Sequence, residues 1–182
     1  WIEGKIRVPR EGERYLALLQ IHSVNGLKPD KARSRLRFSS LQTATSSVGM
    51  SLGDSETGLA ISQATGLGYG DKMLVHSPSI AAHQELIHKM IPLFEAAPII
   101  ILLGAAPMEL EQYQQNYSGE FFCSPAGASP DRHVQAAEFG LLRAKRIAEQ
   151  KNNVVVFISS VEKLLRAYRD NAELAALNGP IA

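Results

Sequence analysis

The 182-residue chain contains a single cysteine, Cys123, so no disulfide can form within it. Long hydrophobic runs are also missing, because no stretch approaches the roughly 18 apolar residues that a transmembrane helix requires. The first residues mix aromatic, aliphatic and charged side chains and show no secretory signal pattern. We therefore expect a cytoplasmic protein with no membrane segment.

Positive charge is scarce in the middle of the chain and concentrated at its start. Between Lys72 and Arg132 the only lysine or arginine is Lys89. Residues 1–50 instead carry nine lysines and arginines against four acidic residues. Such a basic segment is typical either of a solvated surface or of contact with nucleic acid, and both interpretations stay open. The candidate RNA-contacting residues are Arg33, Arg35 and Arg37.

Residue patterns divide the chain into three parts, 1–45, 46–71 and 72–182. The first part predicts an extended β segment and connector, with strands within 5–24 and a further short strand at 36–41. The second part is rich in serine, threonine and glycine, and predicts a linker with little regular structure.

Strand and helix patterns alternate in the third part. The continuous apolar runs at 99–103 and 154–158 suit strands that are buried on both faces of a parallel sheet. Pro107 and Pro130 suit the first position of a helix. The fold class is therefore predicted as α/β, a parallel sheet flanked by helices. The expected strands are 73–76, 99–103, 120–123 and 154–158, and the expected helices are 80–95, 107–116, 130–151 and 160–177.

Residues 76–84 occupy the place of a phosphate loop, between an apolar run and a helix pattern. A P-loop, G-x-x-x-x-G-K-[ST], holds phosphates with backbone amides, a lysine and a hydroxyl group. Here Ser77 lies in the turn, and Ala82, His83 and Gln84 occupy the glycine, lysine and hydroxyl positions. Local chemistry alone therefore predicts only a strand, a turn and a helix.

Five blocks along the chain resemble the bacterial transcription termination factor Rho family, in the same order. The first reads GKIRVPREGERYLALL, and a later one reads SPDRHVQAAE. The resemblance implies a RecA-like fold of the P-loop NTPase type, preceded by the segment that joins it to an RNA-binding domain. It also implies an ATP-driven, ring-forming RNA motor. The blocks are residues 4–19, 66–71, 129–138, 144–146 and 164–168, and the likeness of the first block continues through residues 24–25, 28–29 and 32–33.

The chain departs from the family where the resemblance places the catalytic groups. The family's Asp-Glu-Arg-Pro segment corresponds to residues 104–107, which puts Ala105 at the position of the catalytic carboxylate. Ser159 occupies the position of an aspartate associated with Mg²⁺. With the altered phosphate loop, these changes remove the phosphate cradle, the metal support and the water-activating base. We therefore expect no catalytic residues, no cofactor and no tight binding of ATP or Mg²⁺.

Three functions are compatible with these observations. The leading hypothesis is a non-hydrolysing, Rho-like module that binds itself, a Rho-type ring or RNA. The alternative is a fragment of an ATP-dependent RNA translocase with a divergent nucleotide site. A third hypothesis is an RNA-binding module whose recognition domain precedes Trp1.

Other side chains give weaker signals. The spacing of His83 and His88 does not place both on one helical face, so we expect no metal site. Several aromatic rings have the chemistry to stack on bases, but packing in the core is the favoured interpretation. These rings are Tyr113, Tyr117, Phe121 and Phe122.

Overall fold

A computed structural model describes residues 1–41, 50–96, 98–150 and 152–171. The chain divides into two compact units. The N-terminal unit comprises Trp1–Leu41 together with Lys145–Asn152, and the sheet unit comprises Gln42–Ala144 together with Asn153–Ala182. The boundary falls within one helix, α5 (Pro130–Ala148), whose last turn belongs to the N-terminal unit.

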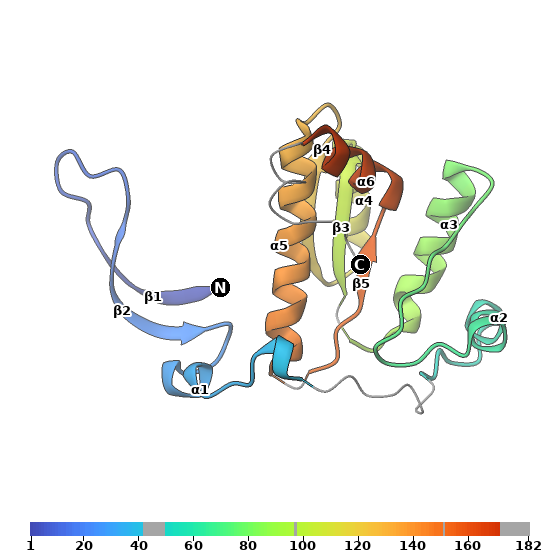
Figure 1. Ribbon diagram of the computed structural model, residues 1–182, viewed down its shortest axis with the longest axis horizontal. Helices are drawn as coiled ribbons and strands as arrows, with labels where there is room; N and C mark the ends of the chain where they lie inside the picture. The colour runs from blue at the N-terminus through green and yellow to red at the C-terminus, as the bar shows by residue number, and fades with distance from the viewer. Residues whose placement is uncertain (42–49, 97, 151, 172–182) are drawn as a thin grey trace. The chain divides into compact units, whose positions relative to one another are not determined.

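A β-hairpin opens the N-terminal unit, as the sequence predicts (Figure 1). Strands β1 (Ile2–Arg7) and β2 (Ala17–Val24) pair antiparallel, with register shifts after Glu3 and Lys5. Gly4 lies at the first shift, where an added Cβ would stand 2.1 Å from the carbonyl oxygen of Gln20. Only glycine allows so close an approach of the two strands.

Two short helices follow the hairpin, α1 (Pro29–Arg33) and the 3-10 helix η1 (Phe38–Ser40). Pro29 fixes the start of α1, because its ring presets a helical φ and it lacks the N–H that a first turn leaves unused. The predicted strand at 36–41 is wrong. The backbone N–H of Phe38 donates to a side chain, Glu149, and so is not available to a strand ladder.

The sheet unit contains three parallel strands in the order β4-β3-β5. Their bounds are Ile99–Ala105 for β3, Glu120–Pro125 for β4 and Val156–Ile158 for β5. The predicted parallel sheet is confirmed, and its central strand is the buried apolar run from Ile99 to Leu103.

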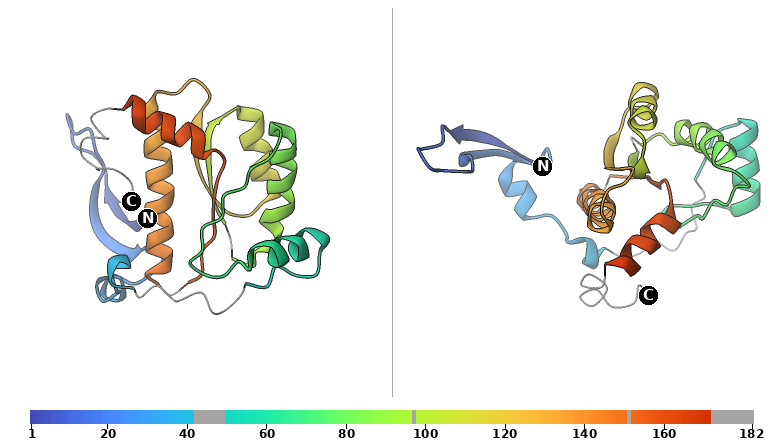
Figure 2. Two further views of the ribbon diagram at one scale, coloured as in Figure 1. Left: turned by 45° about the vertical axis from the view of Figure 1, so that its right-hand side comes forward. Right: turned by 90° about the horizontal axis from the view of Figure 1, so that it is seen from above.

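Helices cover both faces of the sheet (Figure 2). Helix α4 (Pro107–Asn116) connects β3 to β4, and α5 connects β4 to β5 on the other side of β3. In the view from above, α5 and α6 (Val161–Asp170) lie on one face, whereas α3 (Ile80–Met90) and α4 lie on the other. This is the predicted arrangement of a sheet flanked by helices.

Successive side chains of β3 point to opposite faces of the sheet. Ile100 and Leu102 pack in one cluster with Met90 of α3 and Tyr113 of α4. Burying each such side chain contributes about 1.5–3 kcal/mol, so this cluster is a main source of stability.

The predicted strand at 73–76 is absent, because residues 72–77 have no strand geometry. Met73 and Val75 are partly buried against the α3–α4 cluster, and Leu74 between them is 78% exposed. The segment therefore contributes side chains to the core without adding hydrogen bonds to the sheet.

The linker predicted at 46–71 is wrong in part, because it contains helix α2 (Glu56–Thr65). The Ser55 side chain accepts a hydrogen bond from the Gly58 amide, and Gly66 ends the helix at φ +58°. Both are ordinary helix-end signals. The part of the predicted linker before residue 50 lies outside the described residues.

The other predicted helices differ from the observed ones mainly at their ends. Helix α3 stops at Met90 and continues as a short 3-10 turn, η2 (Ile91–Leu93), because Pro92 cannot extend an α-helix. Helix α4 matches its predicted span, and α5 ends at Ala148. The predicted helix 160–177 is α6, and its part beyond residue 171 lies outside the described residues.

Replacing Gly140 with alanine should destabilise the sheet unit by about 1–3 kcal/mol. Helix propensity alone would make alanine more stabilising than glycine by about 1 kcal/mol. The packing clash is therefore expected to reverse the sign of the stability change. The new Cβ would lie 2.6 Å from Cδ1 of Ile101, which is fully buried. Urea unfolding would measure the loss.

Ile101→Val, which deletes that Cδ1 atom, is the matched partner variant. The double variant should lose less stability than the two single losses added together. A more stable Gly140→Ala protein would contradict the packing of α5 on β3.

Candidate nucleic-acid interface

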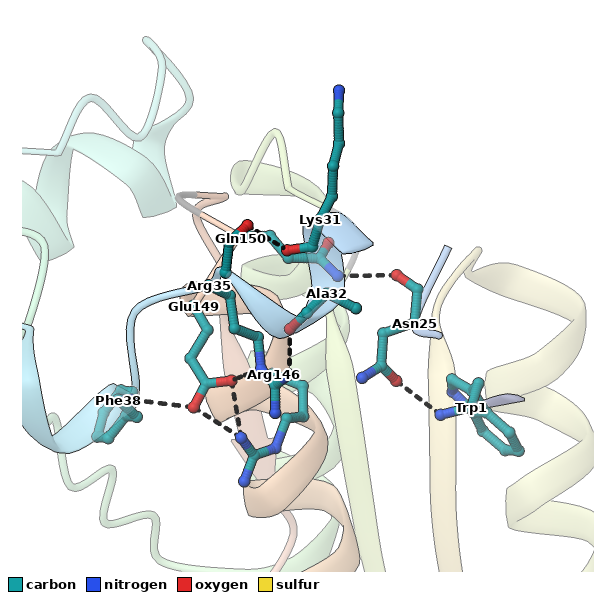
Figure 3. Close-up of polar contacts among 10 residues, drawn as sticks. Trp1, Asn25, Lys31, Ala32, Arg35, Phe38, Arg146, Glu149 and Gln150 are labelled. Carbon is teal, nitrogen blue, oxygen red and sulfur yellow. Dashed lines mark hydrogen bonds and ion pairs between the residues drawn. The ribbon is translucent and has the colours of Figure 1, made fainter. Parts of the chain in front are cut away.

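A buried carboxylate, Glu149, organises the connector (residues 28–38), which is the segment that follows the hairpin. Glu149 follows the last turn of α5, and its side chain is 1% exposed. Its oxygens accept hydrogen bonds from Nε of Arg35 at 2.6 Å, from the amide of Phe38 at 2.9 Å and from Nη1 of Arg146 at 2.7 Å. Two guanidinium groups and one amide thus converge on one acid (Figure 3).

These hydrogen bonds determine the charge state of the acid. Burial alone would raise the pKa of Glu149. The hydrogen bonds from Arg35, Phe38 and Arg146 outweigh that effect and hold the pKa below its ordinary value. A buried carboxylate without such partners would strongly destabilise the fold, so the three donors are required for it to remain ionised.

Further contacts fix the same unit. The Gln150 side chain donates to the backbone oxygen of Asn25 at 2.8 Å, and the amino group of Trp1 donates to the Asn25 side chain at 2.6 Å. Figure 3 shows both contacts beside the Glu149 cluster. The first contact joins the turn after β2 to the chain that follows α5, and the second joins that turn to the first residue.

The three predicted RNA-contacting arginines have different surroundings. Arg33 and Arg37 are exposed. The Arg35 side chain is 31% exposed, and it donates both to Glu149 and to the carbonyl of Ala32 at 2.5 Å. A substitution of Arg35 therefore changes the fold as well as the surface, whereas Arg33 and Arg37 report on the surface alone.

The turn of the hairpin carries an exposed aromatic residue, Tyr15, close in sequence to the exposed Arg10 and Arg14. Glu13 accepts hydrogen bonds from Arg7 at 2.9 Å and from the Arg10 amide at 2.8 Å, and these contacts lower its pKa. The turn that they stabilise leaves Tyr15 85% exposed next to the exposed Arg14. Sequence reasoning did not select Tyr15, although an aromatic residue beside arginine in the basic segment was a usable signal.

The aromatic residues considered from sequence lie in the sheet unit and pack as favoured. Tyr113 is 3% exposed, and its burial raises its pKa to about 12. Tyr117 and Phe121 pack against the same cluster. The Tyr117 hydroxyl lies 2.5 Å from Nδ1 of His88, so this group is engaged inside the sheet unit.

The predicted phosphate-loop position is the start of helix α3. The Ser79 side chain accepts a hydrogen bond from the Ala82 amide at 3.2 Å, and the Ser77 hydroxyl donates to the Ser79 carbonyl at 2.9 Å. The Ala82 amide, one of the backbone groups that would face a phosphate, is therefore already hydrogen-bonded within the chain. Among the described residues, Nε2 of His83 is the one buried side-chain nitrogen or oxygen atom without a hydrogen-bond partner.

The other two predicted nucleotide-site positions lie at the carboxyl edge of the sheet. Ala105 ends β3 and has no polar side chain. Ser159 follows β5, and its hydroxyl accepts from the Leu103 amide at 3.0 Å. At the same edge, the ammonium group of Lys163 donates to the carbonyls of Leu103 and Gly104, at 3.0 and 3.3 Å. These polar groups bind the protein's own backbone.

The described residues show neither a metal-binding cluster nor a membrane-spanning helix. Within the residues that the structure describes, no three histidine, cysteine, aspartate or glutamate side chains gather as they would around a metal ion. In the same part of the chain, no helix has the length and apolar character needed to cross a membrane.

Comparison with known proteins identifies the class of the N-terminal segment first. Residues 1–30, which form the hairpin and the start of α1, match the sequence model of the Rho termination factor RNA-binding domain.

Most of the chain is similar to curated Rho proteins. It is 34% identical to transcription termination factor Rho of Haemophilus influenzae and 33% identical to the Rho proteins of Escherichia coli K12 and Pseudomonas fluorescens biotype C. Each match covers 92% of this chain but 42% of the relative. The chain belongs to the Rho family, and it spans less than half the length of the curated relatives it matches.

Replacing Glu149 with glutamine should lower the unfolding free energy by about 1–3 kcal/mol at pH 7, because two guanidinium groups lose their counter-charge. The depressed pKa means that the wild-type advantage is present above the ordinary glutamate pKa of about 4.3 and is lost as pH falls through the lowered value. Denaturant unfolding at a series of pH values would show the two proteins converging in acid.

Glu162→Gln is the matched control, since Glu162 is 81% exposed in its pair with Arg166 and should give no measurable loss. A Glu149→Gln protein as stable as the wild type at neutral pH would refute the role assigned to the buried carboxylate.

Proposed function

We propose that this chain is an RNA-binding module of the Rho termination-factor family that does not hydrolyse ATP. The observation that carries the proposal is a contrast between two regions. The basic segment at the start of the chain matches an RNA-binding domain. The positions that the family resemblance assigns to nucleotide chemistry hold small or neutral side chains.

The RNA half of the proposal rests on charge and exposed rings. Arg14, Arg33 and Arg37 are exposed, and phosphate contacts by such residues supply most of the sequence-independent affinity for nucleic acid. Tyr15 offers a ring for base stacking, which contributes about 1–3 kcal/mol per base. Many surfaces that bind single-stranded nucleic acid combine cations with exposed aromatic rings.

The proposed loss of ATP hydrolysis rests on the free energy that tight nucleotide binding requires. We infer a RecA-like origin for the sheet unit, since a parallel sheet between two helical layers is compatible with it. Micromolar binding of ATP requires about 8 kcal/mol. A helix N-terminus supplies about 0.3–1 kcal/mol at an exposed position. His83 in place of a lysine and Gln84 in place of a magnesium-binding hydroxyl leave most of that free energy unaccounted for.

Assembly with another chain forms a further part of the proposal. Apolar side chains lie exposed along the hairpin, including Ile6 at 53% and Leu19 at 60%. A two-stranded hairpin is marginally stable by itself, and exposed apolar surface of this kind marks contact sites. The proposed partners are a second copy or a Rho-type ring.

A second candidate function keeps nucleotide binding and is favoured by one observation. Nε2 of His83 is buried without a partner near the start of α3, and a divergent nucleotide site would give it one. In that case the chain would be an ATP-binding fragment of an RNA translocase.

Arg33→Gln with Arg37→Gln should weaken binding to an unstructured single-stranded RNA and flatten its salt dependence. Loss of two phosphate contacts changes the slope of log K against log salt by about 1.4. Fluorescence anisotropy across a series of salt concentrations would measure both effects.

The control is Arg166→Gln with Arg169→Gln, which removes the same charge from exposed positions of α6. Equal losses in the two double variants would mean that net charge, and not the connector, determines RNA affinity.

Titration of the protein with ATP by calorimetry, with and without Mg²⁺, should give no saturable heat below about 1 mM nucleotide, a level that corresponds to about 4 kcal/mol of binding free energy. The triphosphate meets neither a lysine nor a metal site at the start of α3. Saturation at micromolar ATP that is abolished by His83→Ala would instead establish the translocase-fragment function.

A further inference from the structure

The last turn of α5 lies against the connector, although the two are more than 100 residues apart in sequence. Arg146 shares the carboxylate of Glu149 with Arg35. Nζ of Lys145 lies 5.6 Å from the centre of the Phe38 ring. Both contacts fall within the N-terminal unit, so the last turn of α5 and the connector form one surface.

This surface carries a large excess of positive charge. The segments 28–38 and 145–150 contain seven lysines and arginines against two acids, a net charge of +5. This net charge already counts Glu149, whose carboxylate pairs with Arg35 and Arg146. Like charges repel when gathered, and such an excess indicates a polyanionic partner.

Helix electrostatics explains only part of this arrangement. Cations in the last turn of a helix complement its dipole by about 0.3–1 kcal/mol each, which accounts for Lys145 and Arg146. Lys31 and Arg33 also lie in the last turn of the five-residue α1, but Lys28, Arg35 and Arg37 of the connector lie outside that helix. Side chains of Arg35 and Arg146 remain 31% and 36% exposed while Glu149 fixes their guanidinium groups. The Phe38 ring beside them is 44% exposed.

We propose that the last turn of α5 and the connector form one composite binding surface for single-stranded RNA, in which Lys145 and Arg146 contact phosphates next to those held by Arg33 and Arg37. This inference rests on the proposed RNA-binding function and extends it to residues outside the matched segment 1–30. RNA is favoured over an acidic protein because an exposed ring lies among the cations, as in single-strand binding sites.

Lys145→Gln is the direct test, with Arg132→Gln as its control. Both residues are exposed and lie on α5, Lys145 in its last turn and Arg132 in its first. Each variant removes one positive charge from the same helix of the 182-residue chain. With an unstructured RNA of about 12 nucleotides, within the usual site size, only Lys145→Gln should lose affinity. Its slope of log K against log salt should flatten by about 0.7.

The possible results separate this inference from the proposed function. Normal RNA binding by Lys145→Gln, with weaker binding by the Arg33/Arg37 double variant, would overturn the composite surface and leave the proposed function standing. Equal losses in Lys145→Gln and Arg132→Gln would also overturn it, because they would reflect net charge. A wild-type chain that binds no RNA would contradict both. Equal thermal midpoints of the two variants would show that folding is not the cause.

Discussion

The N-terminal unit depends on the carboxylate of Glu149 being ionised in a buried position. An isolated buried charge is too costly to persist, and here two guanidinium groups and a backbone amide compensate it. The arrangement joins the connector to the end of α5, and Arg33 and Arg37 of the connector are exposed. A neutral residue at 149 would leave Arg35 and Arg146 without a common partner, and the basic surface would lose its fixed geometry.

Polar groups in the two units are used in different ways. In the N-terminal unit, Arg33, Arg37 and Lys145 are exposed, and the buried acid Glu149 pairs with the part-buried Arg35 and Arg146. At the carboxyl edge of the sheet, Ser159 and Lys163 are engaged by backbone groups of β3. The second pattern stabilises a strand end, whereas the first leaves charge available to a ligand. This difference is the physical basis for assigning binding to the basic surface.

Sequence patterns predicted the sheet and most helices well, because the signals were local. The apolar run at 99–103 could only be a buried strand or helix segment, and Pro107 set the start of α4. The strand expected at 73–76 failed because an apolar run does not reveal whether a sheet edge is available. Helix α2 was missed although Ser55 and Gly66 mark its ends. The role of Glu149 was not predictable, since nothing local links it to an arginine 114 residues away.

Hydrogen–deuterium exchange on one preparation, with RNA or with Mg·ATP added, would show whether the chain binds RNA at its basic surface and whether it binds nucleotide at the start of α3. RNA should slow exchange of backbone amides in residues 28–38 and 145–150, and Mg·ATP should leave exchange in residues 77–84 unchanged. Slower exchange at 77–84 with Mg·ATP, with no effect of RNA on the basic surface, would contradict the proposed function.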